Sequence, residues 1–342
     1  MSSECQSSSE AGWDGKICVI GAGAWGSALA QVAALGDNDV ILIGRDKKVV
    51  SEINANHTNQ RYLGAQELSK RISASTDMGV LGGAGLVLLA VPAQQTRIVV
   101  KAIPKGLRNK VAVIVTAKGF EKDTLALQSE IVLAHWPDAT PFVLSGPSFA
   151  ADVVAGRPTA VTLAGKDRQE VGHAVSRLAS ERFRPYASFD PLGVQLAGGL
   201  KNVYALACGA VEGAGLGLSA RSALIARAHA EMGRLIVKLG GEPGTAGGLA
   251  GLGDLTLSCT SFQSRNYRFG LELGRGRSVE YLLGIGLGLA EGVATAPVAK
   301  AMAEQNNVEA PLIDAVNRLL EGEQRISDIV ETLMRRPLKQ EG

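Results

Sequence analysis

Residues 16–35 read KICVIGAGAWGSALAQVAAL, an apolar run followed by a glycine-rich turn and a stretch with helical spacing. The apolar run predicts a buried strand, and GAGAWG at residues 21–26 matches the pattern G-x-G-x-x-G. In such a turn Gly21 allows a tight bend, Gly23 lets a pyrophosphate approach the backbone, and Gly26 lets the helix lie close to the sheet. The start of the helix then favours phosphate through its N–H groups and its dipole. This context predicts a dinucleotide site; the alternative is a strand-to-helix turn without a ligand.

The rest of the first half repeats this alternation of apolar, β-branched runs and helical patterns. The predicted strands are residues 16–20, 40–43, 86–91, 111–115, 142–144 and 159–163. Because these runs are apolar throughout, they favour a parallel sheet buried on both faces, built from βαβ units. Beyond residue 190 the pattern is helical. We therefore expect a disordered polar tail (1–15), an α/β Rossmann-type NAD(P)-binding domain (16–190) and an all-helical domain for substrate binding and dimerisation (191–337).

The overall composition excludes several classes of protein. Lys and Arg number 35 and Asp and Glu 33, a net charge of +2, so we expect no nucleic-acid partner. The cysteines form no C-x-x-C pair and the histidines no H-x-x-x-H pair, which predicts reduced thiols and no metal site. Residues 1–15 lack the basic start and apolar run of a signal peptide, so we expect a cytoplasmic protein.

Residues 191–211 carry a single charged side chain, Lys201, in a stretch long enough to cross a bilayer. A lysine at the centre of a membrane span costs about 2.5–3.5 kcal/mol, so we expect a central helix of the helical domain and no membrane insertion. A lysine in an apolar helix is costly unless it is paired, and buried lysines often transfer protons. The alternative is a lysine at a helix edge whose ammonium reaches solvent.

The end of the second predicted strand bears on the choice of cofactor. An NAD-specific site usually has an acidic residue there to bind the ribose 2′-OH, but here Gly44 is followed by Arg45. Arg45 suits a 2′-phosphate or stacking on adenine, so NADP(H) is favoured or at least tolerated beside NAD(H). Asp46 fits better as the N-cap of the next helix than as the ribose ligand.

Four further segments combine residues suited to binding and chemistry. Asp254 follows a glycine-rich turn and is either a helix cap or a carboxylate of the site. The sequence SFQSRN at residues 261–266 combines hydroxyls, the guanidinium of Arg265 and an amide at a predicted helix start, which suits phosphate. The alternative is a solvated helix start. KG at residues 118–119 and SGPSFA at residues 145–150 follow buried strands at their carboxyl ends, where open α/β sheets bind ligands.

Together these motifs resemble the bacterial-type NAD(P)-dependent glycerol-3-phosphate dehydrogenases. The resemblance runs from about residue 16 to residue 311, and the order and spacing of the motifs carry it. They are GAGAWG at 21–26, KG at 118–119, SGPSFA at 145–150, KN at 201–202, GLAGLGDL at 248–255, SRN at 264–266 and EG at 291–292. The resemblance implies a Rossmann-type domain followed by an all-α domain like that of 6-phosphogluconate dehydrogenase, and a homodimer. It also implies reversible reduction of dihydroxyacetone phosphate to sn-glycerol 3-phosphate, which supplies phospholipid synthesis.

The resemblance also implies roles for individual residues. Lys201 is the implied catalytic residue, a proton donor in reduction and an acceptor in oxidation. The implied substrate-binding residues are Lys118, Gly146, Ser148, Lys201, Asp254, Ser264, Arg265 and Asn266. Besides the glycines Gly21, Gly23 and Gly26, the implied cofactor contacts are Ala24, Trp25, Arg45, Lys118, Ala150, Arg265, Leu289 and Glu291. Asp254 either orients Lys201 or accepts a hydrogen bond from the substrate hydroxyl.

Departures from the family pattern occur at Ser219, Ala226, Ala228 and His229, which we expect to lie in the helical core behind the site. They leave the reaction unchanged and bear on subfamily, rate and feedback regulation. Two rival functions share the predicted architecture. One is a reductase of a carboxylate substrate such as ketopantoate, with a different anion site. The other is a protein that binds NAD(P) without turnover.

Overall fold

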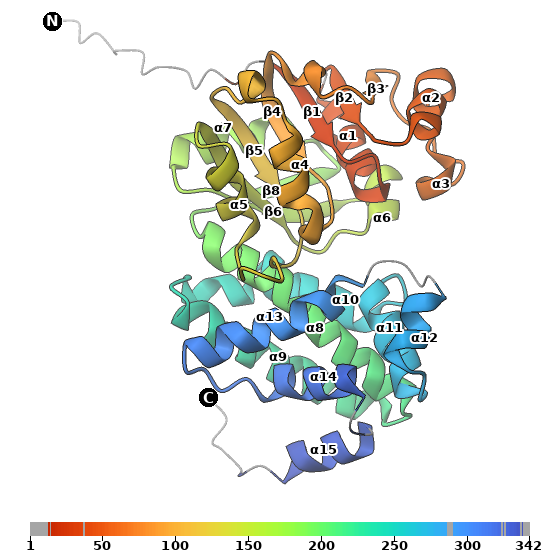
Figure 1. The fold of residues 1–342 in the computed structure, drawn as a ribbon, viewed down its shortest axis with the longest axis vertical. Coiled ribbons are helices and arrows are strands. Elements are labelled where there is room, and N and C mark those ends of the chain that lie inside the picture. Colours follow the sequence, from red (N-terminus) through yellow and green to blue (C-terminus); the bar gives the residue numbers. More distant parts are fainter. Residues whose placement is uncertain are drawn as a thin grey trace, which may run out of the picture.

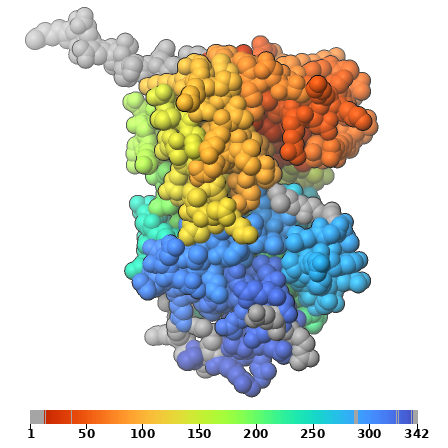
Figure 2. Space-filling model, viewed as in Figure 1, coloured from red at the N-terminus to blue at the C-terminus, as the bar shows by residue number. Residues whose placement is uncertain are grey.

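The structure, a computed structural model, describes residues 13, 15–36, 38–285, 290–322, 324, 326–335 and 337. An α/β domain and an all-helical domain lie one above the other in Figure 1. The space-filling view shows the same division, with the red-to-yellow N-terminal part against the blue C-terminal part (Figure 2). The predicted fold class, a Rossmann-type domain followed by a helical domain, is confirmed.

The described residues of the first domain form one eight-stranded sheet in the order β3-β2-β1-β4-β5-β6-β7-β8. The strands are β1 (Lys16–Ile20), β2 (Val40–Ile43), β3 (Ile72–Ser75), β4 (Ala84–Leu89), β5 (Val111–Val115), β6 (Ala139–Ser145), β7 (Thr159–Ala164) and β8 (Phe183–Ser188). β1 is central, where Ile17 pairs with Val40 of β2 and with Leu86 of β4. The first six strands in this order are those of the doubly wound dinucleotide-binding fold.

The sheet differs from the predicted one at its far edge. β7 pairs with β6 antiparallel, and β8 then runs parallel to β7, so the expectation of a parallel sheet holds only through β6. Two strands were not predicted. β3 is only ISAS, with two apolar residues, and β8 is FRPYAS, an edge strand whose Pro185 and exposed Arg184 obscure the pattern.

Helices cover both faces of the sheet. They are α1 (Ala24–Leu35), α2 (Lys47–Asn56), α3 (Gln60–Leu63), α4 (Thr96–Ala102), α5 (Gln128–His135), α6 (Ala150–Val154) and α7 (Arg168–Leu178). Side chains of β1 alternate between two cores: Ile17 and Val19 pack in the core with α1 and α7, while Cys18 and Ile20 share theirs with α4 and α5. This second core continues into the helical domain, so the two domains share one apolar interior.

The helical domain surrounds one long helix, α8 (Pro191–Gly213), which is buried along most of its length. The others are α9 (Gly217–Lys238), α10 (Asp254–Thr260), α11 (Arg265–Gly274), α12 (Val279–Gly284), α13 (Glu291–Gln305), α14 (Pro311–Glu321) and α15 (Ile326–Met334). A single-turn π-helix, Leu249–Gly253, leads into α10. None of the described helices combines the length and hydrophobicity of a bilayer-spanning segment.

Asp190 caps the start of α8, the helix that follows β8. Its Oδ1 accepts a hydrogen bond from the Gly193 N–H at 2.8 Å, as an N-cap does. Its Oδ2 accepts from the Glu242 N–H at 2.8 Å and from the Thr245 hydroxyl at 2.6 Å, across the helical domain. This buried carboxylate therefore ties the start of α8 to the segment that precedes the π-helical turn.

Helices α8 and α11 pack backbone against backbone. A Cβ atom on Gly209 would lie 2.0 Å from the Tyr267 carbonyl oxygen, and one on Gly270 would lie 2.0 Å from that of Leu206. Gly213 and Gly274 repeat the pattern one turn along, at 2.0 Å and 2.2 Å from the carbonyl oxygens of Leu271 and Ala210. The contact thereby fixes α11 closely relative to α8.

Two expectations need correction. The predicted tail includes Trp13, which is only 2% exposed and packs edge-on against Phe142, so that prediction is wrong at this residue; residues 1–12 and 14 lie outside the described residues. The departures from the family pattern all lie on α9, but only Ala228 is buried in the core, and Ser219 and Ala226 are exposed.

Candidate active site between the two domains

The turn between β1 and α1 leaves open space where a dinucleotide would approach. Gly21 has a φ of +115°, and a Cβ on Gly26 would come within 1.8 Å of the Gly21 carbonyl oxygen, so both positions require glycine. A Cβ on Gly23, by contrast, would meet nothing within 4 Å. Ala24 and Trp25 form the first turn of α1, whose N-terminal N–H groups face this opening. These residues fit a bound pyrophosphate.

A residue that sequence reasoning missed holds this turn in place. Asn59 is fully buried, and its side-chain amide donates to the Ala22 carbonyl at 3.1 Å and to the Ser27 hydroxyl at 2.8 Å. It comes from the segment after α2, and no local pattern in the sequence signals the contact.

At the end of β2, Arg45 is exposed. Asp46 is the N-cap of α2, as predicted: its Oδ1 accepts from the Lys48 N–H at 2.9 Å. Its Oδ2 accepts from Arg61 at 2.9 Å. Both oxygens of Asp46 are therefore occupied, and Arg45 makes no side-chain hydrogen bond or ion pair with any residue the structure describes.

The centre of the site is one carboxylate between two lysines. Asp254, the first residue of α10, is 1% exposed and accepts from Lys118 at 2.7 Å and from Lys201 at 2.9 Å. Lys118 comes from the loop after β5 in the first domain, whereas Lys201 and Asp254 come from the helical domain. Lys201 also donates to the hydroxyl of Ser258, one turn along α10 at 2.7 Å, a partner that sequence reasoning missed. Lys201 is only 8% exposed, so it is a buried, paired lysine and not one that extends to solvent.

The charges of this cluster are coupled. Burial opposes ionisation of Asp254, but the attraction of Lys118 and Lys201 holds the pKa of its carboxyl below the ordinary value. Burial lowers the pKa of the Lys118 ammonium against the attraction of Asp254, and the charge of Lys201 lowers it further. Two lysines thus share one counter-ion in a desolvated place, as is common where protons are transferred.

The loop after β6 completes the first-domain side of the cluster. Gly146 adopts a φ of +142°, and its carbonyl accepts from the Lys118 ammonium at 2.9 Å and from the Ser148 hydroxyl at 3.0 Å. Ala150 begins α6 immediately afterwards. The structure therefore brings together Lys118, Gly146, Ser148, Lys201 and Asp254 through a continuous series of hydrogen bonds.

The SRN segment begins α11 as predicted, but its polar groups divide into two kinds. The Ser264 hydroxyl caps the helix by accepting from the Tyr267 N–H. The Asn266 amide is buried; it donates to Asn202 at 2.8 Å and accepts from the Gly292 N–H at 2.9 Å. Arg265 is exposed, and its guanidinium makes no side-chain hydrogen bond or ion pair within the described part of the chain.

Glu291, at the start of α13, reaches from the helical domain to the first domain. Its carboxylate accepts from the Ala93 N–H at 3.0 Å, in the segment after β4. Burial raises the pKa of this carboxyl, although the charges of Arg265, Lys201 and Lys118 favour its ionised form. Leu289, the other predicted cofactor contact of this segment, lies outside the described residues.

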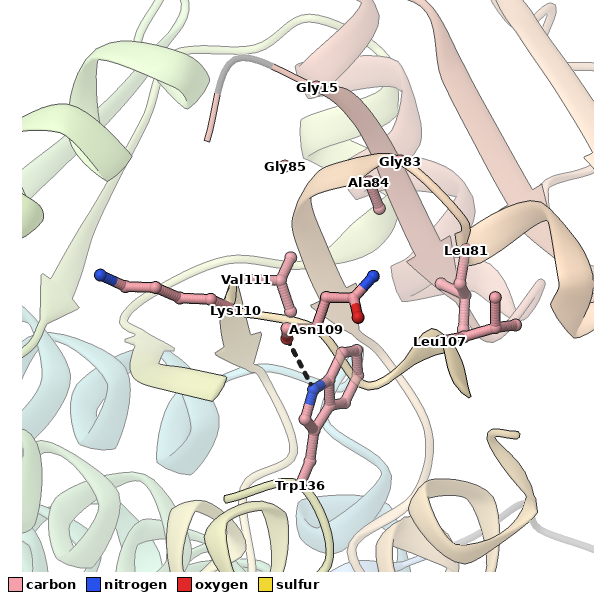
Figure 3. A pocket seen from close by; sticks show the side chains of 10 residues that line it. All are labelled: Gly15, Leu81, Gly83, Ala84, Gly85, Leu107, Asn109, Lys110, Val111 and Trp136. Atoms are coloured by element: carbon pink, nitrogen blue, oxygen red, sulfur yellow. Dashed lines mark hydrogen bonds between the residues drawn. The ribbon is translucent and has the colours of Figure 1, made fainter. Parts of the chain in front are cut away.

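One cavity of the molecule lies away from this site. A cavity of about 230 Å³ lies at the amino ends of β1, β4 and β5, the opposite edge of the sheet from Lys118 and Gly146 (Figure 3). Its lining includes Gly15, Gly83, Asn109, Lys110 and Trp136.

Among the residues with described positions, no group of three or more His, Cys, Asp or Glu side chains is arranged to hold a metal ion.

Comparisons with known proteins identify the family of the chain. A family model described as NAD-dependent glycerol-3-phosphate dehydrogenase N-terminus matches residues 16–171, and one for the C-terminus matches residues 190–331. The chain is 44% identical over 322 residues to the glycerol-3-phosphate dehydrogenase (NAD(P)+) of Maricaulis maris, covering 94% of this chain and 96% of that protein. It is 45% identical over 327 residues to that of Brucella canis, covering 95% and 99%.

Solved structures give the same result at the level of the fold. A glycerol-3-phosphate dehydrogenase from Coxiella burnetii superposes with a TM-score of 0.88 at 36% identity, covering 95% of this chain and all of that one. A ketopantoate reductase from Ralstonia eutropha shares the fold alone, with a TM-score of 0.56 at 15% identity over 94% of this chain and 100% of that one. The resemblance predicted from the motifs is confirmed. Because the two family models together match most of the chain and the relatives align over nearly their full length, the chain belongs to the NAD-dependent glycerol-3-phosphate dehydrogenase family.

Proposed function

We propose that this protein reduces dihydroxyacetone phosphate to sn-glycerol 3-phosphate, reversibly, with NADPH or NADH. The observation that carries the proposal is the Asp254 carboxylate held by Lys118 at 2.7 Å and by Lys201 at 2.9 Å. This cluster lies at the carboxyl ends of the strands, where open α/β sheets bind ligands. Its two ammonium groups suit a substrate whose carbonyl oxygen gains negative charge during reduction.

Each residue of the cluster has a distinct role in this proposal. Lys201 donates its proton to the oxygen that was the ketone oxygen, and takes it back in the oxidation direction. Lys118 adds positive charge beside that oxygen. Asp254 orients both ammonium groups and, because the pKa of its carboxyl is lowered, stays ionised at neutral pH. The Ser258 hydroxyl, 2.7 Å from the Lys201 ammonium, limits the directions in which that ammonium points.

We assign the substrate phosphate to Arg265 and the first turn of α11. An exposed guanidinium that makes no hydrogen bond or ion pair with a described side chain is ready to bind a phosphate with two hydrogen bonds. The N–H groups at the start of the ten-residue helix add donors and a favourable dipole. Ser264 and Asn266 support this site indirectly, because their side chains are engaged in the cap and in the contact with Asn202 and Gly292.

The cofactor site consists of the turn Gly21 to Gly26, with Ala24 and Trp25, Ala150 and Glu291 around it. When bound, the nicotinamide cofactor supplies the hydride. The N–H groups at the start of α1 hold the pyrophosphate, and Arg45 binds the adenosine end, where its guanidinium accommodates a 2′-phosphate. We propose that Leu289 also contacts the cofactor, as the family resemblance implies.

The experiment that tests this proposal is the initial rate of NADPH and of NADH oxidation with dihydroxyacetone phosphate. We expect turnover that requires the phosphate group, and a Lys201→Ala variant that binds NADPH normally but has lost turnover. Lys238→Ala, an exposed lysine on α9, should retain the rate of the unmodified enzyme. A folded protein that binds NADPH and turns over neither cofactor would contradict the proposal. In that case non-phosphorylated keto acids would be assayed next, as the rival reductase requires.

Other parts of the proposal rest on the family resemblance. We propose a homodimer formed through the helical domain, a cytoplasmic location and a role in supplying glycerol 3-phosphate for phospholipid synthesis. We also propose domain limits of 16–190 and 191–337, which meet at the Asp190 cap. Sedimentation across a range of protein concentrations tests the dimer.

A further inference from the structure

The loop that carries Lys118 has no regular secondary structure of its own. Residues 116–127, between β5 and α5, belong to no strand or helix. Their backbone groups therefore need partners outside a sheet or helix, because buried carbonyls are costly when unpaired. Loops of this kind are usually mobile unless other parts of the protein hold them. The position of the Lys118 ammonium thus depends on whatever holds this loop.

Three side-chain amides hold three consecutive carbonyls of this loop. Asn202 of α8 donates to the Lys118 carbonyl at 2.7 Å. Gln128, the first residue of α5, donates to the Gly119 carbonyl at 3.0 Å. Gln94 donates to the Phe120 carbonyl at 2.6 Å and accepts from the Lys122 N–H at 3.1 Å. The amides come from three separate elements, two in the first domain and one in the helical domain.

The side chains of the loop dock on α8 just before Lys201. Phe120 is fully buried, and a Cβ on Gly199 would lie 2.5 Å from its ring. A Cβ on Gly198 would lie 3.6 Å from Cγ of Lys118. Gly199 therefore leaves the space that the Phe120 ring occupies, and the Lys118 side chain lies alongside the neighbouring Gly198. This contact sets the loop against α8 within one turn of Lys201.

Gln128 is the most informative of the three amides. It is 1% exposed, and its Oε1 has no hydrogen-bond partner among the described residues. An apolar side chain of similar size would remove this unpaired acceptor but leave the Gly119 carbonyl unpaired, so the two costs to stability oppose each other. What an apolar side chain lacks is the N–H that binds the Gly119 carbonyl. The Gln128 amide therefore contributes more to the position of the loop than to the stability of the fold.

We infer that Gln128 and Gln94 are positioning residues for Lys118: by fixing the Gly119 and Phe120 carbonyls they hold the Lys118 ammonium on Asp254, at a set place relative to Lys201. Neither glutamine touches the reacting atoms. This inference rests on the proposed role of Lys118 in the reaction. A displacement of about 1 Å of such a group can cost about 100-fold in rate.

The test compares Gln128→Leu and Gln94→Leu with a matched control, Gln195→Leu. Gln195 is also a buried amide at the contact of the two domains, but it binds Ser129 and the Pro191 carbonyl and not the Lys118 loop. For each variant kcat/KM with dihydroxyacetone phosphate, the KM for NADH and the midpoint of thermal unfolding are measured. The primary isotope effect on kcat/KM is measured with NADH deuterated at the transferred position.

We expect Gln128→Leu and Gln94→Leu to lose about 10- to 100-fold in kcat/KM, with little change in the KM for NADH. Their isotope effect should rise, because a misplaced Lys118 slows the chemical step, whereas a smaller fraction of folded enzyme leaves the isotope effect unchanged. Gln195→Leu should keep kcat/KM within about twofold and the isotope effect of the unmodified enzyme.

Two outcomes would overturn the inference: unchanged kcat/KM and isotope effect in both loop variants, or the same losses in Gln195→Leu. Gln94 is only partly buried, so its variant tests the inference even if Gln128→Leu does not fold. Failure of the proposed function is distinguishable, because then the unmodified protein itself does not turn over dihydroxyacetone phosphate.

Discussion

At the scale of single residues, Arg265 differs from the other cations of the site. Lys118 and Lys201 are engaged with Asp254, whereas Arg265 is exposed and makes no side-chain hydrogen bond or ion pair with a described residue. Arg265→Ala should therefore weaken substrate binding and leave the chemical step nearly intact. We expect a loss of about 2–4 kcal/mol, mainly as a higher KM for dihydroxyacetone phosphate. Steady-state kinetics of the variant at saturating NADPH measure it.

Arg268→Ala is the control, because Arg268 is another exposed arginine on α11. An unchanged KM in Arg265→Ala would show that the phosphate binds elsewhere.

The sequence indicated Lys201, Asp254 and Arg265 because each is a charged residue in an unusual setting. It did not indicate Ser258 or Asn59, since a serine within a helix and an asparagine between helices look ordinary until their partners are known.

At the scale of an element, the start of α14 depends on a carboxylate from another helix. Glu231 of α9 is 1% exposed and accepts from the Leu312 and Ile313 N–H groups at 3.0 Å and 3.1 Å. Burial raises the pKa of this carboxyl to about 7, in spite of the two N–H donors. The pKa of a glutamate in an unfolded chain is about 4.3. At pH values between this pKa and the folded-state pKa of Glu231, the native state holds a proton that the unfolded chain has released.

The contribution of Glu231 to stability is therefore full below about pH 4.3 and is lost as pH rises through 7. Relative to Glu231→Gln, which cannot titrate, the unmodified protein should lose about 3 kcal/mol of unfolding free energy between pH 5 and pH 8. Urea unfolding of both proteins across this range measures the difference. A difference that is constant with pH would contradict a raised pKa.

The elements themselves were predictable to different degrees. Strands buried on both faces, such as β1, β2 and β5, are continuous apolar runs, and their predicted limits are those observed. β8 was missed because an edge strand tolerates arginine and proline, and the reversed direction of β7 depends on a connection that the pattern of its side chains does not reveal.

At the scale of the whole molecule, Asp190 ties the start of the helical domain to a distant segment of the same domain. Its Oδ1 acts as an ordinary helix cap, but its Oδ2 accepts from Glu242 and Thr245 in a distant segment. Asparagine replaces aspartate well at an N-cap, yet its NH₂ group cannot accept from those two donors. Asp190→Asn should therefore cost about 1–3 kcal/mol of unfolding free energy, measured by thermal or denaturant unfolding.

Asp167→Asn is the matched control, since Asp167 caps α7 through one oxygen and its side chain makes no hydrogen bond to a distant segment among the described residues. Equal stability changes in the two variants would mean that the second oxygen of Asp190 contributes nothing. The change of pattern in the sequence predicts a domain junction near this residue. It did not reveal the long-range contacts, because Glu242 and Thr245 lie 52 and 55 residues away along the chain.

The glycine contact between α8 and α11 has a consequence for how this protein tolerates sequence variation. In most cores a larger side chain is accommodated when its neighbours change rotamer or are themselves replaced by smaller ones. Here the neighbours are carbonyl oxygens 2.0–2.2 Å from the added methyl group, and no compensating substitution can make a carbonyl smaller. Positions 209, 213, 270 and 274 should therefore be as invariant under random mutagenesis and selection as Lys201, although glycine carries no functional group. An invariant position in this protein therefore has one of two causes: its side chain takes part in the reaction, or there is no space for a larger side chain. Only the structure distinguishes these two causes.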